Sequence, residues 1–171
     1  TACEVVVWAT DSSVVGLFSQ GHQGTRLVAA SVGEQCGSTM GLVSYDIASV
    51  SMFVRSNVAS TGSVSVTVLG AGFGGAAYSP ALRIGGSGCE TMGWTADSSI
   101  MCLSAQGHRG TLWLAVSVGE QWSDMTEVVS YDIASPSSIG AGNAATTGSV
   151  DVTVSGSQFG GRTYSADGRV G

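Results

Sequence analysis

Two short stretches of the chain alternate strictly between apolar and polar residues. They are residues 63–68 (Ser-Val-Ser-Val-Thr-Val) and 149–154 (Ser-Val-Asp-Val-Thr-Val). A period of two places every apolar side chain on one face, which is typical of a β-strand buried on one side. Residues 112–118 and 128–133 are rich in β-branched and aromatic residues and also predict strands.

Glycine-rich segments punctuate these strands, at 70–75, 85–88 and 106–110. Such segments predict turns. The 26 glycines, with almost no stretch of Ala, Leu, Glu and Lys, leave no segment that favours a helix. Several short strands separated by turns predict an all-β chain built as an antiparallel β-sandwich, with no helix beyond short turns.

The whole pattern repeats without gaps at an offset of 86 residues. Roughly half of the aligned positions are identical, and the matches include Cys3 with Cys89, 20–22 with 106–108, 31–35 with 117–121, and 43–49 with 129–135. A unit of this length is large enough to be a small domain rather than one turn of a solenoid. The sequence therefore predicts a tandem array, a form typical of rods, fibres and extended receptors.

The residues also resemble a known family. Residues 147–160 resemble the opening of an IPT/TIG domain, and the resemblance continues in the family's order through 82–89, 94–102, 114–119 and 129–132. IPT/TIG domains are immunoglobulin-like folds found in plexins, growth-factor receptor ectodomains and Rel-type transcription factors. The resemblance covers nearly the whole chain and implies tandem immunoglobulin-like β-sandwiches.

On this interpretation the chain divides into three parts. Residues 1–50 are the second half of one repeat, 51–135 a complete repeat, and 136–171 the first half of the next. Both ends lie at nearly the same phase of the repeat, so we expect the chain to be a segment of a longer polymer-like protein. No Gly/Ser/Pro-rich spacer separates the repeats, which predicts a semi-rigid rod.

The four cysteines predict two disulfide bonds. The family resemblance implies a Cys89–Cys102 bridge between neighbouring strands, which would belong in an oxidising, extracellular setting. Cys3 has no equivalent partner, because Gly16 stands at that position. Counting strand directions places Cys36 at the same end of the sandwich as Cys3, so we expect a Cys3–Cys36 bridge. The alternative is two free thiols packed as small hydrophobic residues.

No combination of residues predicts catalysis. His22 and His108 occupy equivalent glycine-rich turns without a nucleophile and carboxylate beside them, so we expect surface turn residues and no enzyme. Asp11 and Asp97 are expected to cap turns, since no Asp-x-Asp-x-Asp run for calcium exists. We expect no metal and no cofactor.

Three further features have structural explanations. The glycines of 70–74 follow a sandwich strand and open no helix, so they do not predict a phosphate site. Trp8 and Trp94 recur at one position of the repeat and are expected to be core or interface anchors rather than sugar platforms. Asp124 and Glu127 lie in a hairpin and are expected to be solvated.

The charge excludes nucleic acid as a partner. The chain has 6 basic residues, 12 acidic residues and a net charge of −6. A DNA-binding domain of the Rel type needs a basic surface to neutralise phosphates. No apolar run reaches transmembrane length, so no membrane contact is expected within this segment.

The low content of charge predicts a covered surface. Only 11% of residues are charged while 43% are hydrophobic, well below the charge of a well-behaved soluble surface. Either a coat of glycan or burial in a lateral assembly would explain this. No Asn-x-Ser/Thr sequon exists. We expect O-linked glycans at the Ser/Thr clusters, with the best candidates at Thr61, Ser137, Ser138, Thr146 and Thr147.

Three functions fit these features. The first is a structural repeat that self-associates, within the same or neighbouring chains, into an extracellular filament, cell-wall layer or surface appendage. The second is the stalk of a cell-surface receptor or adhesin, and the third an accessory repeat of a secreted carbohydrate-active enzyme. The near-identity of the repeats favours the first, because receptor stalks usually diversify their domains.

Overall fold

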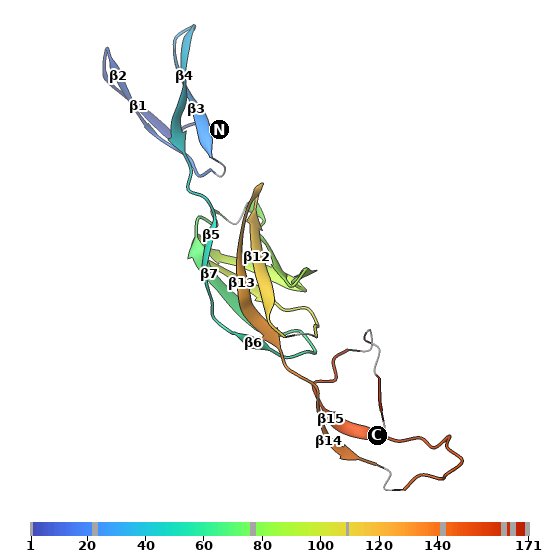
Figure 1. Cartoon of the computed structure of the whole chain (residues 1–171). Coiled ribbons are helices and arrows are strands. Elements are labelled where there is room, and N and C mark those ends of the chain that lie inside the picture. The colour runs from blue at the N-terminus through green and yellow to red at the C-terminus, as the bar shows by residue number, and fades with distance from the viewer. Residues whose placement is uncertain are drawn as a thin grey trace.

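The computed structural model describes residues 2–21, 24–75, 78–108, 110–140, 143–161, 164 and 167–169. Within these residues the chain contains strands and no α-helix, which confirms the all-β prediction. Figure 1 shows three bodies in line: a pair of hairpins near the N-terminus, a central sandwich, and one hairpin near the C-terminus.

The central sandwich has two sheets. The first is four-stranded, and its order is β10 (Thr91–Ala96), β11 (Ser99–Leu103), β7 (Ser65–Ala71) and β5 (Ser49–Phe53). The second is five-stranded, and its order is β6 (Asn57–Val58), β13 (Gln121–Tyr131), β12 (Leu112–Val118), β8 (Ala81–Ile84) and β9 (Ser87–Gly88). All pairings are antiparallel except that of β13 with β6.

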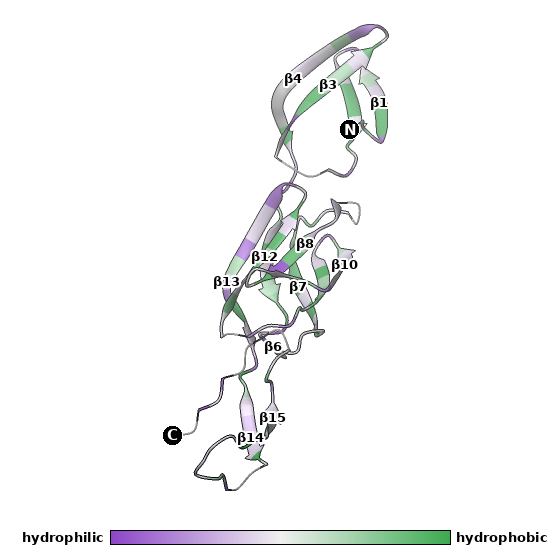
Figure 2. Cartoon of the chain, turned by 90° about the vertical axis from the view of Figure 1, so that its right-hand side faces the viewer, coloured by the Kyte–Doolittle hydropathy of each residue, from purple (hydrophilic) through white to green (hydrophobic). Residues whose placement is uncertain are grey.

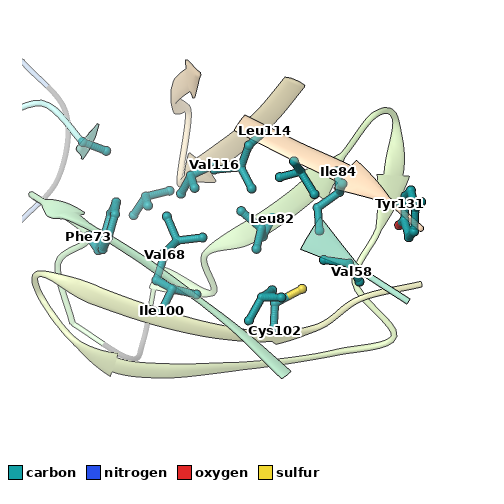
Figure 3. Close-up of a cluster of buried hydrophobic side chains, with 14 residues drawn as sticks. Val58, Val68, Phe73, Leu82, Ile84, Ile100, Cys102, Leu114, Val116 and Tyr131 are labelled. Carbon is teal, nitrogen blue, oxygen red and sulfur yellow. The ribbon is translucent and has the colours of Figure 1, made fainter. Parts of the chain in front are cut away.

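The core lies between these sheets and follows the predicted alternation. Val66 and Val68 of β7 point inward, as do Leu114 and Val116 of β12. Figure 3 shows Val68, Leu114 and Val116 among the side chains that fill the space between the sheets. The complete cluster is Ala48, Val58, Val66, Val68, Phe73, Leu82, Ile84, Ile100, Cys102, Leu114, Val116, Val118, Val129 and Tyr131.

The two end bodies contain parts of the same sandwich. The N-terminal body has two hairpins, β1 (Val5–Thr10) with β2 (Ser13–Leu17) and β3 (Thr25–Val32) with β4 (Gln35–Ser44). The C-terminal body has one hairpin, β14 (Ser135–Ile139) with β15 (Val154–Ser157). When 86 is added to the residue numbers, the register of β1–β2 matches that of β10–β11, and the register of β3–β4 matches that of β12–β13, bulges included. When 86 is subtracted, the register of β14–β15 matches that of β5–β7.

The strands start slightly earlier than the predicted domain limits. Ser49 already pairs with Ala71 in the central sandwich, two residues before the predicted start at residue 51. Ser135, the predicted last residue of the complete repeat, pairs with Ser157 in the C-terminal hairpin.

The predicted strand at 149–154 is largely missing, since only Val154 lies in β15. The equivalent part of β7 is held by β11, with Thr67 opposite Met101. The C-terminal body contains the β5-like strand and no β11-like strand, so residues 149–153 have no ladder to join.

One predicted disulfide is present and the other is wrong. Cys89 and Cys102 are bonded, with a Cα–Cα distance of 5.8 Å, whereas Cys3 and Cys36 are free. Cys3 precedes β1, at the base of the first hairpin. Strand β1 leads away from this base, β2 returns, and β3 leads away again, so Cys36 lies at the far tip. The strand-direction argument omitted β1 and therefore placed Cys36 at the wrong end.

Candidate functional site

The surfaces that recur in this molecule are the junctions between successive bodies. At the first junction, Gln20 of the N-terminal body packs on Gly75 of the central sandwich: a β-carbon at Gly75 would lie 2.4 Å from Gln20 Oε1. At the second junction, Gln106 packs on Gly161 in the same way, with a corresponding distance of 1.8 Å. The two glutamines are 86 residues apart, as are the two glycines, so one contact is used twice.

Tyrosines 86 residues apart also lie at both junctions. Tyr78 lines a hollow of about 390 Å³ at the first junction together with Gln20 and Tyr45. At the second junction, Tyr164 Oη donates a hydrogen bond of 3.1 Å to the carbonyl of Gln106. The ring of His108 meets that of Tyr164 edge-on, with centroids 4.1 Å apart.

A further contact occurs at the second junction. The backbone N–H and the hydroxyl of Ser60 both donate to Gln158 Oε1, at 3.2 and 2.9 Å. Ser60 is fully buried by this arrangement. Because a buried polar group is costly to leave without its hydrogen bond, this contact further holds the C-terminal body against the sandwich.

The loops that carry the two glutamines are held by tyrosines of their own bodies. Tyr131 Oη donates to the carbonyl of Ala105, and Tyr45 Oη donates to that of Ser19, both at 2.9 Å. The Tyr131 ring covers Gly107 so closely that a β-carbon there would lie 2.2 Å from it. Both glutamines are therefore presented by braced loops.

Burial extends the pH range over which the Tyr131 hydroxyl stays protonated. Desolvation raises the pKa of Tyr131 above its ordinary value of 10.0, and the neighbouring Tyr164 and Glu90 raise it further. The phenol therefore remains the donor of the hydrogen bond to Ala105 to a higher pH than an exposed tyrosine would.

The structure describes one of the two predicted histidines. His108 is a surface residue that contacts Tyr164, and His22 lies outside the described residues. The first hollow also contains Glu4, Ser19, Gly21 and Arg26. Among the described residues, no group of three or more His, Cys, Asp or Glu side chains is placed to hold a metal ion. The geometry positions one body on the next.

The expectation that the two tryptophans are core anchors is wrong, since Trp94 on the central sandwich and Trp8 on the N-terminal hairpin are both exposed. Trp94 Nε1 donates to the carbonyl of Gly74 at 2.9 Å, and Asp97 Oδ1 accepts from the Gly74 N–H at 2.8 Å. Asp97 thus ties the β10–β11 turn to the loop after β7. Asp124 and Glu127 are exposed.

The five candidate glycosylation residues are all exposed. Thr61 lies in a turn of the central sandwich, and Thr146 and Thr147 lie in the equivalent turn of the C-terminal body. Ser137 and Ser138 lie on β14, where the Ser137 hydroxyl donates to the carbonyl of Ser155. All five are therefore accessible to a modifying enzyme.

Sequence reasoning missed two features. It aligned Gln20 with Gln106 but did not assign them to a contact. The available signal was that Gln20 and Tyr78 both recur 86 residues further on, as Gln106 and Tyr164. It also missed an exposed aromatic surface, where Trp113, Ala115, Trp122, Asp124 and Thr126 line a shallow hollow. The alternation of β12 places Trp113 opposite the buried face of Leu114, and could have indicated it.

Comparisons with known proteins match the fold described above. The IPT/TIG domain family matches residues 48–131. A structure of the full extracellular region of plexin A4, domains 1 to 10, is similar at a TM-score of 0.50 and 14% identity; it covers 74% of this chain and 11% of the plexin chain. A second structure of that region, domains 1 to 8, is similar at a TM-score of 0.49 and 15% identity. It covers 70% of this chain and 12% of the plexin chain.

A structure of SGBP-B, from a complex xyloglucan utilization locus in Bacteroides uniformis, is similar at a TM-score of 0.44 and 14% identity, and covers 74% of this chain and 35% of that one. The chain therefore spans between about a tenth and a third of these structures. A search of the curated proteins found no match. No helix in the described part of the chain is long and apolar enough to span a membrane.

Proposed function

Because residues 48–131 of this chain are an IPT/TIG domain, an immunoglobulin-like sandwich, we propose that the chain is a structural repeat of an extracellular filament, cell-wall layer or surface appendage. In this role the chain has no catalytic activity and needs no cofactor. Its partners are copies of the same sequence, in the same or in neighbouring chains.

The observation that carries this proposal is the reuse of one junction. The glutamine–glycine contact and the tyrosine beside it recur on both sides of the central sandwich at positions 86 residues apart. When the same head-to-tail contact is applied again and again, it generates an open helical filament rather than a closed ring, unless the rotation happens to close. The junction thus supports a regular rod.

The remaining features support an extracellular place for that rod. The Cys89–Cys102 disulfide is stable in oxidising compartments and rare in the cytosol. A coat of O-linked glycan on the exposed Ser and Thr residues would compensate for a surface with few charges and many exposed apolar side chains.

Negative-stain electron microscopy of the purified protein at micromolar concentration tests this proposal. We expect unbranched filaments with an axial repeat of one sandwich. A Gly161→Gln variant is the control for the junction, because its long side chain cannot occupy the space filled by Gln106 and should disorder the filaments. Discrete particles in the wild type at every concentration would favour a receptor stalk and contradict the filament.

A further inference from the structure

The outer face of the five-stranded sheet carries a shallow hollow between two exposed tryptophans. Trp113 of β12 is 41% exposed and Trp122 of β13 is 69% exposed. Together with Ala115, Asp124 and Thr126 they line a hollow of about 500 Å³. Both strands have their sheet neighbours in place, β8 beside β12 and β6 beside β13, so the hollow is a surface of the central sandwich itself.

The strand register places polar groups between the two rings. Trp122 pairs with the residue four positions after Trp113 on β12, a separation of about 13 Å, because a strand rises about 3.3 Å per residue. Between them, Asp124 of β13 and Arg83 of β8 lie on either side of the small Ala115, and both are exposed. Figure 2 shows β12 and β13 side by side, with hydrophilic residues interspersed along β13.

This combination of groups suits a neutral sugar. The flat face of a Trp ring carries partial negative charge and packs well against the C–H groups of a pyranose ring. Sugar hydroxyls can donate to the Asp124 carboxylate and accept from the Arg83 guanidinium. Because these two charges are opposite, the hollow favours a ligand of neither sign. The distance between the rings requires a ligand longer than one sugar.

The residues of the hollow differ between the two copies of the repeat, unlike those of the junction. Residues 122–128 and 36–42 differ at every position, although they stand between two blocks that are identical in both copies. Leu27 and Cys36 stand where the two tryptophans stand in the central sandwich. A contact between copies in a regular array would reuse the same residues in every copy. This difference therefore favours an occupant other than a second copy.

Backbone strain beside Trp113 supports a binding role. Strand β13 bulges where it passes Trp113, between the partners of Leu112 and Leu114, and Glu127 in this bulge has a φ of 57°. The equivalent residue of the other copy is Gly41, a residue type that adopts positive φ without strain. Bulges and strained residues of this kind are frequent beside functional sites, where they re-aim side chains.

We propose that Trp113 and Trp122 form a platform that binds an extended, uncharged oligosaccharide, with Asp124 and Arg83 contacting its hydroxyl groups. The platform lies wholly on the central sandwich, so binding does not depend on filament formation. It gives the proposed rod a means of attaching to neutral polysaccharide along its side.

Isothermal titration calorimetry of the full chain with cellohexaose and with xylohexaose tests the platform. We expect saturable binding of at least one of them. Trp113→Ala and Trp122→Ala should each weaken that binding by about tenfold or more, as is usual when a central aromatic contact is truncated. Trp8→Ala is the matched control, because Trp8 is also 69% exposed but lies on β1 of the N-terminal body, and it should bind like the wild type.

Thermal unfolding shows whether the variants remain folded, and Trp122→Phe, which keeps an aromatic face, should bind more tightly than Trp122→Ala. Wild-type protein that binds neither hexasaccharide would overturn the proposal, as would binding that both alanine variants retain in full. If the alanine variants instead lose self-association by light scattering and the wild type binds no sugar, the platform contacts a second copy and the proposal is wrong. The filaments themselves are judged separately, by microscopy.

Discussion

At the residue scale, a few close contacts give each junction its shape. Tyr131 covers Gly107 and bonds to Ala105, which places Gln106 where it meets Gly161. Glycine is required at these points because the neighbouring ring or amide occupies the space of a β-carbon. The motif Gln-Gly-His is therefore a packing motif, in which the glycine receives a tyrosine and the glutamine reaches the next body.

Replacing Tyr131 with Phe removes the hydroxyl that bonds to Ala105. We expect the free energy of unfolding of the central sandwich to fall by about 1 kcal/mol, the usual value of one hydrogen bond. Urea denaturation at neutral pH measures this change. An unaltered midpoint would show that the hydroxyl does not brace the loop.

The same variant predicts a pH effect. Because the pKa of Tyr131 is raised in the folded state above 10.0, its contribution is fully present below pH 10 and is lost as the pH rises through the folded pKa. The wild type should therefore lose stability above pH 10 more steeply than Tyr131→Phe. Parallel curves for the two proteins would show that Tyr131 titrates alike in the folded and unfolded states.

A Gly107→Ala substitution should destabilise the central sandwich. Its β-carbon would lie 2.2 Å from the Tyr131 ring, and such overpacking costs about 1–3 kcal/mol. Gly110→Ala is the matched control, because nothing lies within 4 Å of a β-carbon there. Thermal unfolding distinguishes the two; equal melting temperatures would contradict this account of the loop.

At the element scale, local alternation predicted the strands well and their partners poorly. The pattern of 63–68 correctly marked the buried face of β7, because burial on one side imposes a period of two. The same pattern at 149–154 did not form a strand, because a strand also needs a neighbour that the local sequence does not contain. Likewise, Cys36 was misplaced because its position depends on the number of strands that separate it from Cys3.

The first hairpin offers a test of this corrected geometry. Gly16 stands where Cys102 stands in the central sandwich, and a β-carbon at Gly16 would lie 3.1 Å from Cys3 Sγ. We expect the thiol introduced by Gly16→Cys to form a disulfide with Cys3, equivalent to the Cys89–Cys102 bond. Non-reducing peptide mapping detects it, with Gly24→Cys as a control that stays unpaired. Recovery of Cys3 and the introduced thiol in free form under oxidising conditions would contradict the β1–β2 register.

At the scale of the whole molecule, the repeated junction is the contact from which sandwiches of modest size would build the proposed rod. The fold class could be predicted from the sequence, because it depends on the pattern of apolar residues and turns within one unit. The junction could not, because Gln20 and Gly75 are brought together only by the fold. The proposed function depends on that contact occurring at every step.

A glycan coat should be visible in the mass of the native protein. We expect protein from its natural source to be heavier than its 17.1 kDa polypeptide mass per segment by whole numbers of sugar residues. Intact-mass spectrometry before and after chemical removal of O-linked sugars measures the difference. A native mass equal to the polypeptide mass would rule out the coat and leave lateral burial as the explanation for the low charge.

The most direct test of the repeated junction is a comparison of two distances by double electron–electron resonance. Spin labels at Thr25 and Ser51 span the first junction, and labels at Thr111 and Ser137, each 86 residues further on, span the second. Both pairs are placed in a Cys3→Ser/Cys36→Ser background and diluted with unlabelled protein. The account predicts narrow distributions with the same mean distance. Distributions that are broad, or whose means differ by more than the reach of the labels, would contradict the claim that one rigid step builds the rod.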